Sequence, residues 1–417
     1  MSILIKNALL NGSRSDILIR ANRIDRIDNN LTKDADEIIQ ADGMAILPSF
    51  ANAHTHAAMT LMRGYADDMV LQEWLENYIW PLEAKLTQKD VYWGSKLACL
   101  EMIKSGTTLF NDMYWHFHGT ARAAEEMGMR AFISGVLIDQ FDKEKSDEMI
   151  KQNKQLFNES KEYSDRIIFS LGPHAIYTVS EKSLSWVAEF ARENELLVHL
   201  HVSETKDEVD QCLENHNMRP VEYLDKIGIL GPNLLSIHSI WLNNNEIRLL
   251  KENDVKLIHT PISNMKLGSG IFPIEKMLDR NLTVGIGTDG CSSNNNLDML
   301  EEIKFASMLH KIHFRDTTIM SAEDTYKLAT YNTKKLFNLN MGEIKEGYLA
   351  DLILLDLNNE SMIPNYNLIS NIVYSAGKDC VDTTICDGKI LMRNGKVEGE
   401  EEIKQKAREA AEDLIKR

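Results

Sequence analysis

Residues 45–56 read AILPSFANAHTH, an apolar run with one proline that ends in two histidines separated by a single residue. Side chains two positions apart on a β-strand project from the same face, so His54 and His56 are expected side by side if this run is a strand. Two neighbouring imidazoles can hold a metal ion, but they can equally be ordinary polar residues at a strand end. The ends of the other apolar runs therefore have to decide between these interpretations.

Seven further short runs of aliphatic and β-branched residues follow, each separated from the next by a segment with helical periodicity. They are TTLFNDM, MRAFISGVL, RIIFSLGPH, LLVHLHVSE, LLSIHSI, VKLIHTP and LTVGIGTDG. Eight strand–helix units over about 300 residues predict an α/β fold of the (β/α)8 or TIM barrel type, in which functional residues gather at the C-terminal strand ends. A doubly wound open sheet is the alternative, disfavoured because the chain carries no glycine-rich dinucleotide fingerprint.

Both ends of the chain have a different pattern, that of short strands joined by turns. Residues 1–48 alternate short apolar runs with turn residues, and GEIKEGYLADLILLDL and VDTTICDGKILMRNGKV near the other end contain DG and NG turns. A charged amphipathic helix is expected from about Glu400. We expect residues 1–48 and 346–417 to form one small β-sandwich domain, and residues 49–345 to form a metal-dependent (β/α)8 barrel.

The composition limits the class of partner. The 417-residue chain has 43% hydrophobic and 26% charged residues and a formal net charge of −17. An acidic protein is repelled by nucleic acid and by anionic membranes, so small molecules are the expected ligands. The five cysteines are scattered without a CxxC pair, which argues against a disulfide framework or a thiolate zinc site. With no signal-peptide pattern and no run of about 18 apolar residues, we expect a cytoplasmic protein without a membrane span.

Polar residues stand at the C-terminal ends of several proposed strands, and a barrel brings these ends to a single mouth. His54 and His56 end the first strand, His174 the fourth, His201 the fifth, His238 the sixth and Asp289 the eighth. Taken singly, each histidine fits an ordinary core or surface role, but their common position favours a site. The set His54, His56, His201 and Asp289 contains three imidazoles and a carboxylate, which suits one zinc or iron(II) ion and leaves a position for water.

A divalent cation in such a site lowers the pKa of bound water from about 16 to about 7, so that hydroxide is available at neutral pH. Three residues beyond His201, Glu204 lies past the strand end and within reach of a substrate bound over the metal. We expect Glu204 to deliver protons during the reaction; the alternative is a solvated loop carboxylate.

An ordered series of motifs along the whole chain resembles the amidohydrolase superfamily. The motifs are FANAHTHAAMTLMRGYADDMVLQEWLENYIWPLE, SGTTLFNDMY, GPHAIYT, VHLHVSET, SIHSIWL, SNMKLGSGIFPI, GIGTDGCSSNNNLDML and GEIKEGYLADLILLD. They are most similar to the mononuclear adenosine-type branch, the methylthioadenosine/S-adenosylhomocysteine deaminases and 5′-deoxyadenosine deaminases. The resemblance implies hydrolytic deamination of 5′-modified adenosines to the inosine analogue and ammonia, and a homo-oligomer, either dimer or tetramer.

The same resemblance implies roles for individual residues. Members with two metals carry a carboxylated lysine at the end of the fourth strand, where this chain has His174, so one metal is expected. His238 is expected to hold and orient the attacking water, Asp289 to take its proton while binding metal, and Glu204 to protonate the purine at N1. Glu83 in IWPLE matches the family residue that accepts hydrogen bonds from ribose hydroxyls, and Trp80 and His174 are expected to line the nucleoside pocket. The alternatives are a solvated helix carboxylate for Glu83 and a core position for Trp80.

Three further residues carry chemistry without fitting this set. His116 and His118 form a second HxH pattern, but they lie beyond the predicted end of the second strand and are expected in a loop at the mouth, not at the metal. Cys291 follows Asp289 by two positions, and with no basic residue beside it a buried packing role is favoured over a reactive thiol.

Two other functions remain open. The same metal site could deaminate guanine or another aminated heterocycle, such as a pterin or triazine, although a free base has no ribose for Glu83 to bind. A non-catalytic scaffold on this fold is the second alternative, and the complete set of ligands and acid–base residues argues against it.

The choice among nucleosides depends on the segment after the third strand. Relatives that act well on S-adenosylhomocysteine resemble one another in carrying arginines there, where a guanidinium can bind the amino acid carboxylate. The corresponding AFISGVLIDQFDKEKSDEMIKQN contains no arginine; Ser134 is expected at the strand end, followed by Lys143, Lys145 and Lys151. We therefore expect 5′-deoxyadenosine, 5′-methylthioadenosine or adenosine to be preferred over S-adenosylhomocysteine, unless a lysine or Arg63 reaches the carboxylate.

Overall fold

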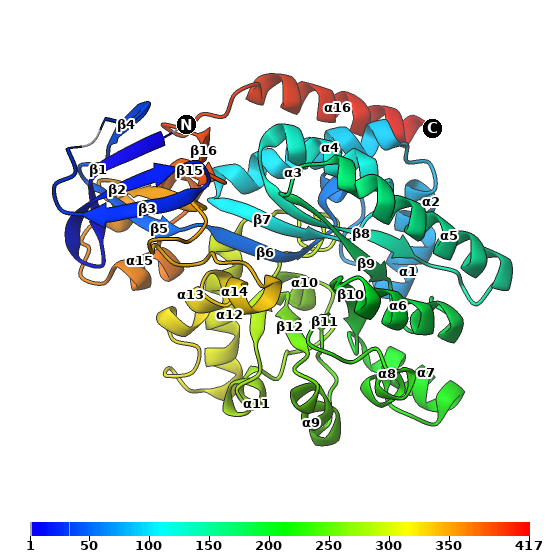
Figure 1. The fold of residues 1–417 in the computed structure, drawn as a ribbon. Coiled ribbons are helices and arrows are strands. Elements are labelled where there is room, and N and C mark those ends of the chain that lie inside the picture. Colours follow the sequence, from blue (N-terminus) through cyan, green and yellow to red (C-terminus); the bar gives the residue numbers. More distant parts are fainter. Residues whose placement is uncertain (1, 33) are drawn as a thin grey trace.

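Eight parallel strands form the centre of the computed structural model, which describes residues 2–32 and 34–417 (Figure 1). Each is hydrogen-bonded to the strand next in sequence, in the order β6 to β13. The strands are β6 (Phe50–Thr55), β7 (Thr107–Asp112), β8 (Arg130–Leu137), β9 (Ile167–Pro173), β10 (Val198–Val202), β11 (Leu234–His238), β12 (Lys256–His259) and β13 (Val284–Ile286). All eight runs expected from the sequence are strands, which confirms the predicted barrel.

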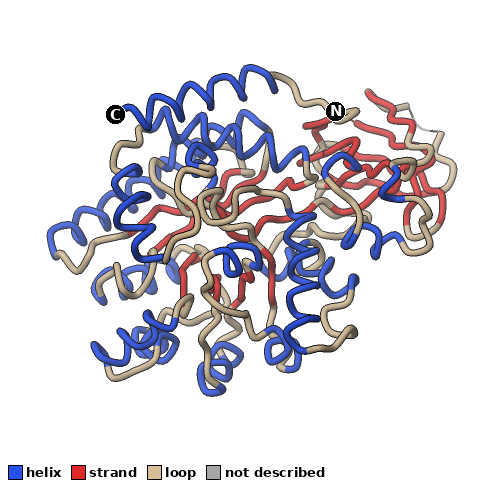
Figure 2. Tube along the Cα trace, turned by 180° about the vertical axis from the view of Figure 1, so that it is seen from behind, coloured by secondary structure: helices blue, strands red, loops and turns tan. Residues whose placement is uncertain are grey.

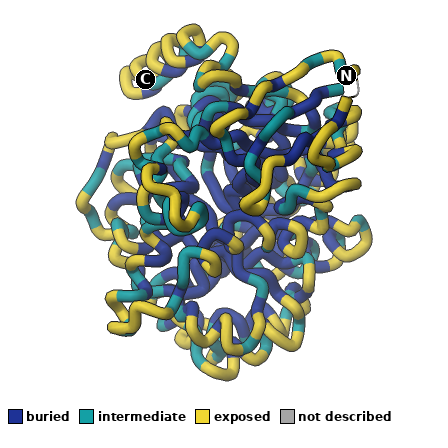
Figure 3. Tube along the Cα trace, turned by 90° about the vertical axis from the view of Figure 1, so that its left-hand side faces the viewer, coloured by how far each residue is buried: buried dark blue, intermediate teal, exposed yellow. Residues whose placement is uncertain are grey.

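Helices surround these strands, as the view from behind shows (Figure 2). The helices between successive strands include α3 (Gln88–Lys104), α4 (Phe117–Met127), α5 (Lys143–Glu159), α6 (Glu181–Glu193), α7 (Lys206–His216), α8 (Pro220–Ile227), α9 (Asn244–Glu252), α10 (Pro261–Lys266) and α11 (Ile274–Asp279). After β13 come α12 (Met299–Phe314), α13 (Ala322–Ala329), α14 (Thr333–Phe337) and α15 (Leu368–Tyr374). Many begin with a side-chain cap; Thr87 and Asp90 form a capping box at the start of α3. Apolar residues of strands and helices form one large buried cluster, the dark interior of Figure 3.

The barrel closes where β13 meets β6. The backbone N–H of Asp289 donates to the His54 carbonyl at 3.0 Å, and that of Thr288 donates to Asn52 Oδ1 at 3.0 Å. A Cβ on Gly287 would lie 2.5 Å from the His54 nitrogen, so only glycine permits this approach. The closure brings the residues after β13 directly against the histidines that end β6.

The two chain ends combine into a second, eight-stranded mixed sheet. Its strands are β1 (Ser2–Leu10), β2 (Ser13–Arg20), β3 (Arg23–Asp28), β4 (Glu37–Gln40), β5 (Met44–Pro48), β14 (Leu352–Asp356), β15 (Val381–Cys386) and β16 (Lys389–Met392). The N-terminal and C-terminal halves pair through β5 and β14, and β1 meets β5 through the single pair Leu9 and Ala45. Side chains from both halves share one apolar core, including Ile17, Ile46 and Leu354. This confirms the predicted small β domain built from both ends.

The last helix, α16 (Glu400–Lys416), begins at the residue expected from the sequence. It packs along α3 of the barrel, where Lys104 pairs with Glu400 and Arg417 pairs with Asp90 (Figure 1). The domain boundaries at residues 48 and 346 remain a prediction, and α16 lies over the barrel although it follows the β domain in sequence. Among the described residues, no helix has the length and apolar character needed to cross a membrane.

One predicted strand end is wrong. Ser134 lies inside β8, which continues to Leu137 because Val136 and Leu137 pair with Gly172 and Pro173 of β9. The Ser134 hydroxyl lies 2.9 Å from that of Ser170 on β9. The segment without arginine therefore begins three residues later than expected.

Candidate metal and catalytic site

The polar residues expected at the mouth meet at the C-terminal ends of the barrel strands. His54 is on β6, His56 follows that strand, His174 follows β9, His201 is on β10, His238 ends β11, and Asp289 lies just beyond β13. His56, His174, His201, His238, Glu204 and Asp289 all line one cavity. The structure thus brings together residues from widely separated parts of the chain.

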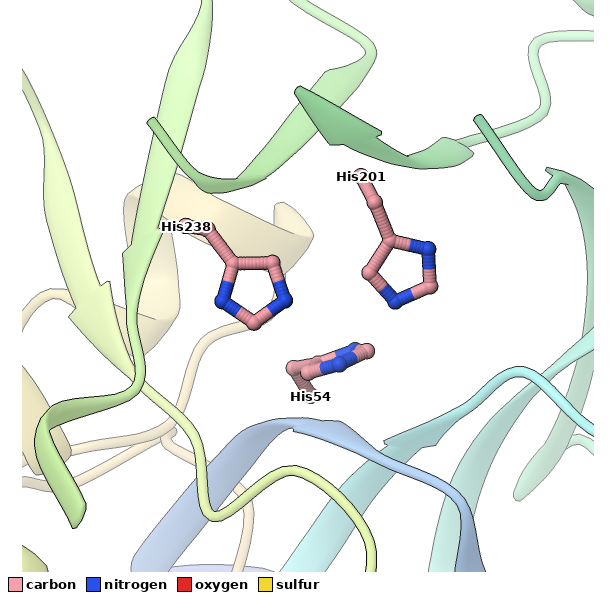
Figure 4. Close-up of side chains that lie close together, drawn as sticks. All are labelled: His54, His201 and His238. Atoms are coloured by element: carbon pink, nitrogen blue, oxygen red, sulfur yellow. The ribbon is translucent and has the colours of Figure 1, made fainter. Parts of the chain in front are cut away.

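The donor atoms of these side chains are close enough to share a metal ion. Ligand atoms of His54, His201 and His238 all lie within 4.8 Å of one another (Figure 4). The same holds for the ligand atoms of His54, His56 and Asp289. The Nε2 atoms of His54 and His56 are each 3.2 Å from Asp289 Oδ1. Imidazoles and a carboxylate converging in this way fit a divalent cation such as zinc or iron(II).

Hydrogen bonds orient two of the imidazoles for this role. The Nδ1 of His56 donates to the Met113 carbonyl at 2.6 Å, and that of His201 donates to the His174 carbonyl at 2.8 Å. A carbonyl oxygen only accepts hydrogen bonds, so the hydrogen must reside on Nδ1 in both rings. In the neutral form of each ring the lone pair is therefore on Nε2, the nitrogen that is available to a metal ion.

The third imidazole, His54, has a different partner. Its Nδ1 lies 2.6 Å from Nε2 of His199, a fully buried residue on β10. If His54 holds a metal through Nε2, its Nδ1 carries the hydrogen and donates it to His199. Nδ1 of His199 has no hydrogen-bond partner within the described part of the chain.

Asp289 is held as an anion. Its Oδ2 accepts hydrogen bonds from the hydroxyls of Ser263 at 2.6 Å and Ser293 at 2.9 Å. Burial alone would raise the pKa of this carboxyl, but the hydrogen bonds and charges of His54 and His56 keep the pKa well below its usual range. Conversely, burial lowers the pKa of His56, and the contact with Asp289 outweighs it and raises the pKa to about 9. The site therefore favours positive charge beside Asp289, as it would favour a cation.

Glu204 lines the same cavity as Asp289 but has a different environment. It is buried, its Oε2 is 3.7 Å from His238 Nε2, and its Oε1 is 3.4 Å from the hydroxyl of Ser269. Burial raises the pKa of this carboxyl, with opposition from the neighbouring His238. Two carboxyl groups in one cavity thus have pKa values displaced in opposite directions, the usual arrangement for a separate acid and base.

The loop that carries Glu204 is fixed by Glu208, whose contact, like that of His199 with His54, was not predicted from the sequence. The carboxylate of Glu208 accepts hydrogen bonds from the backbone N–H groups of Ser203 and Glu204, both at 2.8 Å. Ser203 has a φ of 51°, a left-handed conformation that needs support in a residue with a side chain. Glu208 therefore stabilises the turn that directs Glu204 into the cavity.

His238 is oriented from behind by two polar side chains. Its Nδ1 lies 2.9 Å from Asn264 Oδ1 and 2.9 Å from the hydroxyl of Thr260. Its Nε2 lies 3.7 Å from Glu204 Oε2, and the ring lies beside those of His54 and His201 (Figure 4). His238 can therefore act either as a metal ligand or as a partner for a bound water.

A helical segment covers one side of the cavity. It consists of α1 (Leu71–Trp74), a π-helical turn (Leu75–Ile79) and α2 (Trp80–Glu83). Trp80 and Glu83 both line the cavity, as does His174. Burial raises the pKa of the Glu83 carboxyl, and hydrogen bonds from Tyr114 and Trp115 oppose this shift. All three residues expected at the substrate thus face the same space as the imidazoles.

A second cavity adjoins the first, and the two share Trp80, Glu83, Tyr114 and Trp115 among their lining residues. His116 and His118 line this second cavity and not the first. His116 lies 3.0 Å from the Leu86 carbonyl, and His118 contacts Tyr163 and Glu159 at 3.0 Å and 2.8 Å. His116 precedes α4 as expected, but His118 is the second residue of that helix and not part of a loop; both lie outside the cavity lined by the imidazoles.

Positive charge is scarce around both cavities. Lys145 is the one lysine that lines the second cavity, and no arginine lines either cavity in residues 2–32 and 34–417. Arg63 is paired with Glu101 and donates to the Asn295 carbonyl, so its guanidinium is already engaged. Cys291 is fully buried, and burial raises the pKa of its thiol, in keeping with a packing role.

The sequence of this chain is similar to those of known proteins. Residues 45–391 match the model of the amidohydrolase family. A protein of Thermococcus sibiricus named 5-methylthioadenosine/S-adenosylhomocysteine deaminase is 48% identical over 400 residues, covering 94% of each chain. A protein of Methanobrevibacter smithii named 5′-deoxyadenosine deaminase is 45% identical over 426 residues, covering 99% of this chain and 98% of its own.

The fold also matches solved structures. The crystal structure of an adenosine deaminase from Xanthomonas campestris with bound zinc superposes with a TM-score of 0.94 and 30% identity, covering 100% of this chain and 98% of the other. The similarity extends over both the barrel and the β domain.

Proposed function

Because this chain belongs to the amidohydrolase family, we propose that it hydrolytically deaminates the adenine ring of 5′-modified adenosines. Water replaces the amino group at C6, and the products are the inosine analogue and ammonia. The observation that carries this proposal is the placement of Glu204 in one cavity with the imidazoles and Asp289. A proton donor and a hydrolytic centre are then both within reach of one purine.

One divalent metal ion would be held by His54, His56, His201 and Asp289. A cation in such a site acts as a Lewis acid and makes hydroxide available at neutral pH. Zinc is favoured by the donor set and by the zinc in the Xanthomonas structure, and iron(II) suits the same ligands. Hydrogen bonds from Nδ1 of His56 and His201 to carbonyls support this ligand set, because they leave Nε2 of both rings available.

Three residues would move the protons of the reaction. Glu204, whose pKa is raised by burial, would hold a proton and give it to ring N1 as water attacks C6. Asp289, whose pKa is depressed, would remain ionised and accept a proton from the attacking water. His238 would orient that water, since Thr260 and Asn264 hold its Nδ1 and direct Nε2 into the cavity.

The nucleoside would be recognised by other residues of the cavity wall. Glu83 would accept hydrogen bonds from the ribose hydroxyls, and Trp80 and His174 would line the base and sugar positions. A carboxylate in that role would favour a nucleoside over the alternative substrates, which are guanine, pterins and triazines. The adjoining cavity beyond Glu83 offers space for the 5′ substituent, so that 5′-deoxyadenosine, 5′-methylthioadenosine and adenosine are the favoured substrates and S-adenosylhomocysteine a weaker one.

We also propose that the enzyme acts in the cytoplasm as a homo-oligomer, a dimer or tetramer. All five cysteines are buried and unpaired, which suits a reducing compartment. The domain organisation proposed from the sequence has a β domain from residues 1–48 and 346–417 and a barrel from 49–345. One apolar cluster lies wholly within the β domain, whereas the large cluster joins barrel residues to β-domain residues such as Leu47 and Ile353.

Loss of adenine absorbance with a panel of 5′-substituted adenosines, guanine and pterins tests the proposed substrate class. We expect turnover of the adenosines with release of one ammonia per nucleoside, and none of guanine or the pterins. Faster turnover of guanine or a pterin than of every adenosine would instead support the alternative.

A further inference from the structure

Helix α12 has apolar residues on two opposite faces. Its inner face, which includes Leu300, Ile303 and Ala306, is buried against the barrel. On its outer face Phe305, Met308 and Ile312 are 38%, 47% and 73% exposed. A helix on the surface of a globular protein normally has one apolar stripe, directed at the core. A second stripe directed at solvent therefore indicates a surface that another molecule covers.

The outer stripe continues into a charged residue at each end. Glu301, Phe305, Met308, Ile312 and Arg315 are separated by four, three, four and three residues, the spacing of a helix–helix seam. Glu301 is partly exposed near the helix start, and Arg315 is exposed at its C-cap. The Arg315 guanidinium makes no hydrogen bond or ion pair with any described residue of this chain. The stripe is thus apolar in the middle, with Glu301 at one end, where it accepts a hydrogen bond from Asn296, and Arg315 at the other, beside Asp316, whose carboxylate is held by Thr318.

We propose that this face of α12 is a two-fold interface at which a second copy of the chain packs its own α12 antiparallel to the first. With the two-fold axis at Met308, each Met308 faces its counterpart and each Phe305 faces Ile312 of the second copy. Each Glu301 then lies opposite Arg315 of the second copy. Residues 301 and 315 are equally distant from Met308, and residues 305 and 312 differ in their distance from it by one residue, or about 1.5 Å along the helix axis.

The charge order identifies a second copy as the occupant. Reversing the direction of the helix exchanges its negative and positive ends, so the stripe is complementary to itself, as an interface between identical subunits requires. In a parallel arrangement, like charges would face each other at both ends.

An interface at this face needs residues beyond α12. Specific dimers commonly bury about 1,600 Å² in total, more than one pair of helices supplies. α15 packs beside α12, where the hydroxyls of Ser307 and Tyr374 lie 2.9 Å apart, and α12 lies on the outside of the barrel next to α13 (Figure 1). The segment leading into α15 contains the exposed Ile363 and Tyr366. This inference is independent of the catalytic assignments, because it uses no residue of the cavity.

Sedimentation velocity at about ten micromolar protein tests the interface through Ile312→Lys. The wild-type protein is expected to be dimeric or larger, and the variant is expected to dissociate at least about 100-fold more readily, because the substitution puts a charge into the apolar part of the seam twice per dimer. Leu213→Lys, an exposed leucine on α7, is the matched control and should keep the wild-type association state. A monomeric wild-type protein, or equal behaviour of the two variants, would overturn the proposal.

The antiparallel register has its own test in two charge reversals. Glu301→Arg and Arg315→Glu should each weaken the dimer about tenfold, because each places two like-charged contacts in the interface. A mixture of the two variants should recover wild-type association, since a dimer with one copy of each variant has opposite charges facing each other at both contacts. Circular dichroism establishes that each variant is folded. Failure of the mixture to associate better than either variant alone would contradict the register.

Discussion

Glu204→Gln separates proton transfer from metal binding more cleanly than other substitutions in the cavity. The amide has nearly the shape of the carboxyl group and keeps an oxygen for the hydroxyl of Ser269, 3.4 Å away. Glu204 does not belong to either group of side chains close enough to share a metal. The variant should therefore fold and bind metal like the wild type, but it has no proton to give to the purine ring.

The expected loss follows from the role of Glu204 as a buried acid. Positioned acid–base groups contribute about 100-fold to 10,000-fold to a rate, equivalent to about 2.7 to 5.5 kcal/mol at 1.36 kcal/mol per tenfold. We expect kcat to fall by at least about 100-fold with 5′-deoxyadenosine, and KM to change much less, because the interaction acts mainly in the transition state.

The assay is loss of adenine absorbance, together with elemental analysis of each protein. Asp207→Asn is the control, because Asp207 is an exposed carboxylate on the adjacent helix and its substitution should leave kcat unchanged. A Glu204→Gln enzyme with full metal content and most of its kcat would refute the assignment and make Glu204 a bystander. A variant that loses its metal would instead show that Glu204 supports the ligands.

Three further predictions concern other parts of the site. His199→Leu should weaken zinc binding about 10-fold to 100-fold in competition with a chelator, because His54 loses its hydrogen-bond acceptor. His199→Gln should recover part of that affinity. Equal zinc affinity of His199→Leu and the wild type would exclude a role of His199 in orienting His54. Glu83→Ala should lower kcat/KM for nucleosides with intact ribose hydroxyls more than for 2′-deoxy analogues, and equal losses would remove the ribose assignment. S-adenosylhomocysteine should have a kcat/KM about tenfold or more below that of 5′-deoxyadenosine, because no arginine among the described residues lines the cavities to bind its carboxylate. A hydrogen bond to such a charged group is worth roughly 1.5 to 3 kcal/mol. Side-by-side kinetics that show a preference for S-adenosylhomocysteine would contradict this prediction.

The barrel could be predicted because each strand is a short apolar run and the local pattern is sufficient to recognise it. The meeting of the polar residues at the mouth of the barrel could be predicted from one geometrical rule, that the C-terminal ends of barrel strands share one rim. His54, His201 and His238 lie on three different strands, and they converge as that rule requires (Figure 4). The pairing of β5 with β14, which lie far apart in the sequence, could be anticipated only from the similar turn-rich pattern of the two ends.

The contacts that were missed depend on distances between elements rather than on local pattern. His199 and His201 are two positions apart on β10 and share a face, so they form the same histidine-x-histidine pattern as His54 and His56. Only the folded structure, in which β10 lies near β6, shows that His199 contacts His54. Glu208 resembles an ordinary residue in the first turn of a helix, and its two backbone contacts appear only in the folded loop. Ser134 was misplaced at the end of β8 although the apolar run continues to Leu137, and pairing with β9 continues through Gly135, Val136 and Leu137.

Removal and restoration of the metal tests the central claim most directly. Protein shown by elemental analysis to be metal-free should not reduce the adenine absorbance of 5′-deoxyadenosine, and one equivalent of zinc or iron(II) per chain should restore turnover, with one ammonia released per nucleoside. Undiminished turnover by the metal-free protein would contradict a metal-dependent deaminase, and so would a fully metal-loaded protein that deaminates no adenosine.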